Sequence, residues 1–128
     1  TRYFRSKLLG KRNAYKPNMQ PEATILGQKQ WKWLESSMNQ TTASIIVILS
    51  SIQILATEHP YEKWANFPLE RKRLLNLISL VSNDKTIVAV SGDRHRAEQA
   101  STEIITLLKL PLHRSTNQVP KIQKLISC

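Results

Sequence analysis

The sequence predicts an α/β fold in which a helix joins two buried, parallel strands of one sheet. The apolar run ASIIVILSSIQIL at residues 43–55 lacks the polar alternation of a half-exposed strand, which is typical of a strand covered on both faces. The amphipathic stretch PLERKRLLNLISLVS follows at 68–82, and the short apolar run KTIVAV follows at 85–90. Together they make one βαβ crossover of normal length, which favours a right-handed connection.

The segment before the first buried strand predicts one further helix. Residues 3–9 are expected to be extended, and residues 10–21 to form an irregular connection, because one glycine and two prolines interrupt a polar run. Apolar side chains then recur at i, i+3 and i+7, namely Trp31, Leu34 and Met38. This spacing predicts a helix of about three turns from near Gly27 to near Asn39.

The second helix, at 68–82, has a defined start and a clear apolar side. Pro68 suits a first helical turn, where its missing N–H costs nothing. The apolar side is formed by Leu74, Leu75, Ile78 and Val81, and the polar residues Arg71, Lys72 and Asn76 lie largely elsewhere. In such α/β sheets, functional residues collect at the carboxyl ends of the strands. Residues 50–53 and 91–95 are therefore expected side by side.

The net charge of +10 is concentrated at the two ends of the chain. Residues 1–20 hold six basic groups and no acid, whereas residues 21–98 hold nine basic groups against eight acids. This distribution does not favour a nucleic acid as a specific partner, because such domains usually spread Lys and Arg over one face of the folded core.

Neither a disulfide nor a membrane span is predicted. No stretch reaches the roughly 18 apolar residues of a membrane span, and a single cysteine, Cys128, allows no intrachain disulfide. Because the sequence begins at Thr1 rather than at methionine, we expect the original N-terminus to precede it.

The stretch Ser-Gly-Asp-Arg-His at 91–95 holds the strongest candidates for chemistry. Gly92 is expected to let the chain turn sharply after the second buried strand. Asp93 and His95, two positions apart, can then face one pocket and bind one or two metal ions. The alternative is an aspartate that caps local amides beside an exposed histidine. Arg94 is either a phosphate-binding group or a solvated charge, and the same holds for Arg96.

Other conspicuous side chains have simpler interpretations. His59 is expected to be a loop residue without a catalytic role. The three tryptophans are expected to pack in the core or in a lid, because they are not clustered with the basic residues: Trp31, Trp33 and Trp64. The sequence contains no Gly-rich phosphate loop, G-x-S-x-G elbow or H-E-x-x-H motif.

Three ordered segments resemble a known family. They are ILGQKQWKWLE at 25–35, SSIQILATEHPYEKWANFPLERKRLLNLI at 50–78 and VAVSGDRHRAE at 88–98, and the opening TRYFRS adds a fourth similarity. In this order they resemble the C-terminal half of the catalytic domain of PhoD-type alkaline phosphatases, which are metallophosphoesterases of the calcineurin-like superfamily. The most specific elements are W-x-x-F-P-x-E-R at 64–71 and S-G-D-R-H at 91–95. The resemblance covers residues 1–98 and leaves 99–128 as a divergent segment.

The resemblance implies a four-layer α/β/β/α fold that hydrolyses phosphate mono- or diesters at a metal centre containing iron and calcium. By position it implies Asp93 and His95 as metal-binding and catalytic residues. The position of Gln53 in the family pattern likewise implies that it lines the pocket. Substrate-binding arginines are implied at three positions: Arg2, Arg5 and Arg94.

The family pattern is incomplete in this chain. The superfamily's earlier ligand motifs would precede Thr1, so we expect the chain alone to be inactive, and residues 99–128 are hypothesised to reflect a frameshift or an aberrant splice. Members of the family are often exported. Since no signal peptide is visible in this chain, its localisation is not assigned. Two alternatives remain, a basic module that binds nucleic acid or acidic proteins without catalysis, and a structural relic of the enzyme.

Overall fold

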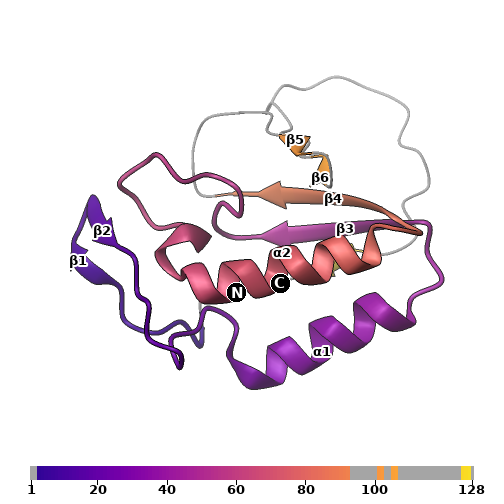
Figure 1. Cartoon of the computed structure of the whole chain (residues 1–128), viewed down its shortest axis with the longest axis horizontal. Helices are drawn as coiled ribbons and strands as arrows, with labels where there is room; N and C mark the ends of the chain where they lie inside the picture. Colours follow the sequence, from indigo (N-terminus) through magenta and orange to yellow (C-terminus); the bar gives the residue numbers. More distant parts are fainter. Residues whose placement is uncertain (1–2, 93–100, 103–104, 107–124, 128) are drawn as a thin grey trace.

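The computed structural model describes residues 3–92, 101–102, 105–106 and 125–127. The elements of this part of the chain are β1 (Leu9–Lys11), β2 (Ala14–Lys16), α1 (Gly27–Gln40), β3 (Ile45–Ser50), the 3₁₀ turn η1 (Trp64–Asn66), α2 (Pro68–Val81), β4 (Thr86–Ser91), β5 (Ser101–Thr102), β6 (Ile105–Thr106) and β7 (Leu125–Ser127). Figure 1 shows a sheet with α1 and α2 on one side and the β1–β2 hairpin beyond its end.

The described strands form a five-stranded sheet and a separate two-stranded hairpin. The order in the larger sheet is β5-β6-β4-β3-β7. β3 is parallel to both β4 and β7, β4 is parallel to β6, and β5 runs antiparallel to β6. β3, α2 and β4 therefore confirm the predicted βαβ crossover between parallel strands, and with it the α/β class.

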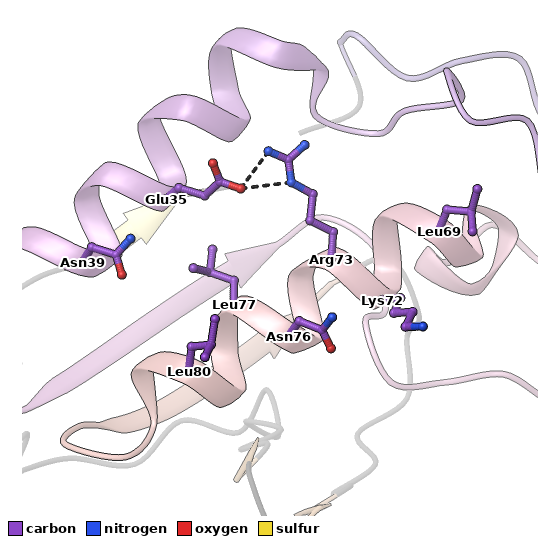
Figure 2. Close-up of a pocket in the computed structure, with 8 residues that line it drawn as sticks. All are labelled: Glu35, Asn39, Leu69, Lys72, Arg73, Asn76, Leu77 and Leu80. Carbon is purple, nitrogen blue, oxygen red and sulfur yellow. Dashed lines mark hydrogen bonds and ion pairs between the residues drawn. The ribbon is translucent and has the colours of Figure 1, made fainter.

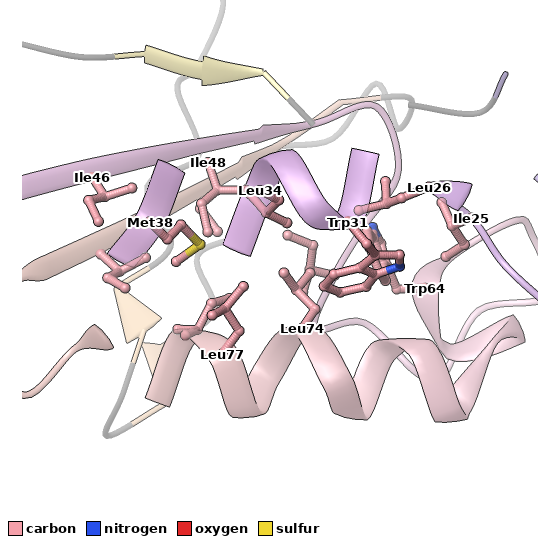
Figure 3. Close-up of a cluster of buried hydrophobic side chains, with 14 of the residues drawn as sticks. Ile25, Leu26, Trp31, Leu34, Met38, Ile46, Ile48, Trp64, Leu74 and Leu77 are labelled. Atoms are coloured by element: carbon pink, nitrogen blue, oxygen red, sulfur yellow. The ribbon is translucent and has the colours of Figure 1, made fainter. Parts of the chain in front are cut away.

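A hydrophobic core lies between the helices and one face of the sheet (Figure 3). α1 contributes Trp31, Leu34 and Met38, the three residues of the predicted stripe, and all are buried. Alternate residues of the strands face them, because side chains of a strand point to opposite faces in turn. The buried strand residues of this cluster are Ile46, Ile48, Ile87 and Ala89. Two helices and one sheet face thus share a single core.

The opposite face of β3 and β4 is apolar but less well covered. Ile45 is 45% exposed, and Leu49, Val88 and Val90 are half-buried. Only Val47 of this face is buried in β3. The expectation that the strands are covered on both faces is therefore met in full only in the middle of β3.

The first buried strand is shorter than predicted. β3 ends at Ser50, although the apolar run continues to Leu55. Its parallel partner β4 also ends here, with Ser50 opposite Ser91, so the following residues have no ladder partner. Ile52 and Ile54 are buried in the core all the same, at 0% and 1% exposure. Their hydrophobicity reflects burial in an irregular segment rather than a strand.

The N-terminal region forms a hairpin where an extended opening and an irregular connection were predicted, so that prediction was wrong. Lys11 pairs with Ala14 across a two-residue turn in which Asn13 has a φ of 64°. Gly10 has a φ of 89°, and a Cβ there would lie 2.5 Å from the carbonyl oxygen of Ala14. The backbone pairing depends on these two positions, and the strands are too polar for an alternation of apolar residues to reveal it.

The prediction for the tryptophans holds for two of the three. Trp31 and Trp64 are buried at 1% and 0% exposure and contact each other edge-on, with ring centroids 6.5 Å apart. Trp33 is 46% exposed, so it does not pack in the core, and the alternative of packing in a lid stays a prediction. It lies on the other side of α1 from the buried stripe, because neighbouring helical positions differ by about 100°.

Candidate functional site

The candidate site lies at the carboxyl ends of the neighbouring strands β3 and β4. The parallel register runs from Ile45 opposite Thr86 to Ser50 opposite Ser91. One further backbone hydrogen bond, from the Gly92 N–H to the Ser50 carbonyl oxygen at 3.0 Å, extends the pairing by one residue. The chain therefore leaves both strands at neighbouring points. Gln53 follows one of them and the Ser-Gly-Asp-Arg-His motif ends the other.

Gly92 continues the strand pairing, and the sharp turn expected after it would fall on residues outside the described part of the chain. Its φ is outside the left-handed region, and among the described residues a Cβ built there would come within 4 Å only of the carbonyl oxygen of Ser51, at 3.9 Å. Within the described part of the chain, neither the backbone conformation nor the space around the residue requires a glycine here.

Gln53 is a buried polar residue in the loop that follows β3. It is 8% exposed, and its amide oxygen Oε1 is inaccessible to solvent. Among the described residues, no group donates a hydrogen bond to this oxygen. An unpaired buried acceptor costs about 1–3 kcal/mol. Such an oxygen suits a cation or a hydrogen-bond donor that is not part of the described chain.

The predicted metal ligands lie outside the described residues. These ligands are Asp93 and His95, and their shared pocket remains a prediction. Two predicted substrate-binding residues, Arg2 and Arg94, also lie outside the described part of the chain. Within the described part of the chain, no three His, Cys, Asp or Glu side chains gather closely enough to hold a metal ion.

Arg5 is the one predicted substrate-binding arginine with a described position. Its Nε lies 2.8 Å from a carboxylate oxygen of Glu62, and its Nη1 donates to the Ser6 carbonyl oxygen. Glu62 belongs to the long loop between β3 and η1. The ion pair brings a half-buried guanidinium to this loop, and the arginine's charge is largely balanced by the carboxylate.

The same loop holds a buried lysine and the histidine for which we expected no catalytic role. Lys63 is 6% exposed, and its Nζ donates to the carbonyl oxygens of His59 and Tyr61. Burial lowers the pKa of Lys63, and the nearby Glu58 carboxylate partly opposes the shift. The Nδ1 atom of His59 accepts a hydrogen bond from the Tyr61 N–H, which confirms a loop position for this residue.

The lowered pKa of Lys63 predicts a pH dependence of stability. The unfolded chain, with a lysine pKa of 10.5, binds the proton more tightly than the folded chain does. The free energy of unfolding should therefore rise with pH between the folded-state pKa and 10.5. Urea unfolding between about pH 8 and about pH 10 checks this, and Lys63→Met should flatten the rise. Lys72→Met, at an exposed position, should keep the wild-type slope, and an equal slope for Lys63→Met would contradict the prediction.

Sequence reasoning missed a buried carboxylate, Glu70, that joins the two helices. Glu70 is 7% exposed and accepts hydrogen bonds from the Thr24 hydroxyl, the Ile25 N–H and the Trp31 indole N–H. The Thr24 hydroxyl in turn accepts the N–H of Gly27, the first residue of α1. A signal was available, since an acid occupies the buried side of α2: Glu70, Leu74, Leu77, Ile78 and Val81.

A groove lies elsewhere in the described part of the chain, between α1 and α2 (Figure 2). Its volume is about 530 Å³, and Arg73 and Glu35 form an ion pair of 2.7 Å at its side. Its lining residues come only from the two helices: Glu35, Asn39, Leu69, Lys72, Arg73, Asn76, Leu77 and Leu80. The groove is therefore distinct from the candidate site at the carboxyl ends of β3 and β4.

Comparison with known protein families shows which class of protein this chain belongs to. The family model of the PhoD-like phosphatases matches residues 1–111. The chain belongs to the PhoD-like phosphatase family. No significant match was found among curated proteins or solved structures.

Family membership bears on the expectations from sequence. It confirms the resemblance and does not favour the alternative of a basic, non-catalytic binding module. In addition, none of the helices in the described ranges is sufficiently long and apolar to span a membrane.

Proposed function

We propose that the carboxyl ends of β3 and β4 form part of a metal-dependent phosphoesterase site, with Asp93 and His95 as metal ligands and Gln53 beside them. The observation that carries this proposal is the unpaired, buried Oε1 of Gln53 at the end of β3. Family membership supplies the chemistry, hydrolysis of phosphate esters. The register that ends β3 opposite β4 supplies the proximity, because it starts the two segments from adjacent residues.

The residue types fit the metals implied by family resemblance, iron and calcium. Carboxylate and amide oxygens suit calcium, and imidazole suits iron. A bound metal ion would polarise a phosphoryl oxygen and lower the pKa of a bound water. The carboxylate of Asp93 and the imidazole of His95 would hold this charge at the strand end, and Gln53 would offer its free oxygen.

Three arginines are proposed to bind the remaining phosphate oxygens: Arg2, Arg5 and Arg94. Guanidinium groups match the geometry of phosphate and stay charged at all relevant pH values. The position of Arg5 supports this role, because its ion pair with Glu62 fixes the guanidinium against the loop after β3. Glu62 would then orient the arginine as well as balance its charge. The substrate is proposed to be a phosphate mono- or diester.

The apolar face of the sheet opposite the helices supports the finer fold assignment, a four-layer α/β/β/α arrangement. In such a fold a second sheet packs about 10 Å from the first, face to face. Ile45, Leu49, Val88 and Val90 present an apolar surface suited to that packing. We propose that this surface is where the second sheet of the family fold would lie.

Metal binding by the full chain tests the proposal. Mn²⁺ serves as the probe, and electron paramagnetic resonance separates free from bound ion. His95→Ala and Asp93→Asn should each weaken Mn²⁺ binding by at least about tenfold. His113→Ala, which removes a histidine outside the family motifs, is the matched control and should bind Mn²⁺ as the wild type does. Turnover of nitrophenyl phosphate and its diester in the same samples reports any hydrolysis. Unchanged Mn²⁺ binding in His95→Ala would refute the metal site.

A further inference from the structure

The segment that follows β3 leaves the sheet, yet each of its four carbonyl oxygens accepts a hydrogen bond. Residues 52–55 pair with no strand in the described part of the chain. The Ile52 oxygen accepts from the Ser50 hydroxyl at 2.7 Å, and the Gln53 oxygen accepts from the Trp64 backbone N–H at 3.0 Å. The oxygens of Ile54 and Leu55 both accept from Arg71, at 2.7 and 3.0 Å. Because buried carbonyls must be paired, these donors determine the path of the segment.

Trp64 holds the first half of the segment through two of its N–H groups. Besides the backbone bond to Gln53, its indole N–H donates to the Ser50 hydroxyl at 3.0 Å, and that hydroxyl donates onward to Ile52. The indole is fully buried and packs edge-on against Trp31. Its position is therefore fixed by the core, and the Ser50 hydroxyl is oriented by it.

Arg71 holds the second half with a charged group. Its side chain reaches from α2 to two successive carbonyl oxygens, and burial lowers the pKa of its guanidinium. In the described part of the chain, no carboxylate forms an ion pair with it. Arg71 is half-buried, and even partial burial of a charge without an acid partner is costly, a cost that an apolar side chain on α2 would avoid. What the guanidinium adds is geometry, because its planar fork fixes two carbonyls at once.

We propose that Ser50, Trp64 and Arg71 are positioning residues that hold Gln53 at the strand end. Gln53 lies between the two halves of the segment, so its side chain is attached to a backbone that is fixed on both sides. The inference rests on the proposed function, which places Gln53 in the phosphate pocket. Trp64 and Arg71 are the first and last residues of the W-x-x-F-P-x-E-R motif. The inference gives both a role in positioning the site, without contact to substrate.

Two conservative substitutions in the full chain test this inference. Arg71→Lys keeps the charge but loses the fork, and Ser50→Ala removes the hydroxyl link to Ile52. The matched control is Arg73→Lys on the same helix, where the arginine's Nε and Nη2 both donate to Glu35 at the surface. Nuclear magnetic resonance of the Gln53 side-chain amide reports its position. Mn²⁺ affinity, measured at low temperature where every variant is folded by circular dichroism, reports the site.

We expect Arg71→Lys and Ser50→Ala to move the Gln53 amide signals and to weaken Mn²⁺ binding by about tenfold, the effect typical of outer groups at a metal site. Arg73→Lys should change neither. If the two variants only lower the unfolding temperature and leave the signals and the affinity at wild-type values, the inference is overturned. Gln53→Ala separates the two proposals. Should it bind Mn²⁺ like the wild type, Gln53 is not at the metal site, and the amide signals alone decide whether the three residues position it.

Discussion

Glu70→Ala is expected to lower the free energy of unfolding by about 2–5 kcal/mol, because each buried donor left without an acceptor costs about 1–3 kcal/mol. Three donors would lose their acceptor at once: the Thr24 hydroxyl, the Ile25 N–H and the Trp31 indole N–H. Two of them are themselves buried, so water cannot replace the carboxylate without opening the core. The start of α1 should loosen as well, because Gly27 depends on the oriented Thr24 hydroxyl.

Urea unfolding followed by circular dichroism measures this effect, with Glu35→Ala as the control. Glu35 pairs with Arg73 at the surface, where such ion pairs contribute at most about 1 kcal/mol. The comparison removes an acid from either helix and changes the net charge equally. If both variants unfold at the same urea concentration, Glu70 does not hold the helices together.

The helices could be predicted from the sequence because burial on one side leaves a periodic record. Trp31, Leu34 and Met38 mark α1, and Pro68 marks the start of α2. The irregular segment after β3 left no such record. Ile52 and Ile54 look like a continued strand, although they pack in the core without a ladder partner. Composition reports burial there but not the backbone path.

The candidate site could be predicted only where a motif carried it. Asp93 and His95 came from a two-residue spacing and from family resemblance, and they stay a prediction. Gln53 came from its position in the family pattern, and the structure adds that its oxygen is buried and unpaired. Ser50 and Arg71 gave no signal as positioning residues, because their partners are backbone carbonyls, which exist at every position of any sequence.

Two neighbouring residues of the W-x-x-F-P-x-E-R motif, in the first turn of α2, contact different parts of the structure. Glu70 reaches toward α1, and the next residue, Arg71, reaches toward the segment after β3. Adjacent helical positions point about 100° apart, so neighbouring residues can serve different sides of one helix. Trp64 adds a third attachment, through Ser50, to the end of β3. The motif therefore fixes α2 against both the helix layer and the end of β3, where we propose the site.

The packing of α2 on the core should depend most on Leu74. This residue is 0% exposed and lies near Trp31 between the two helices (Figure 3). Leu74→Ala should lower the free energy of unfolding by about 2–5 kcal/mol, since the lost methyl groups leave a cavity that a rigid core fills only in part. Leu80→Ala on the same helix, at 74% exposure, should change it by less than about 0.5 kcal/mol. Urea unfolding of both variants checks the difference, and equal midpoints would show that α2 does not pack on this core through Leu74.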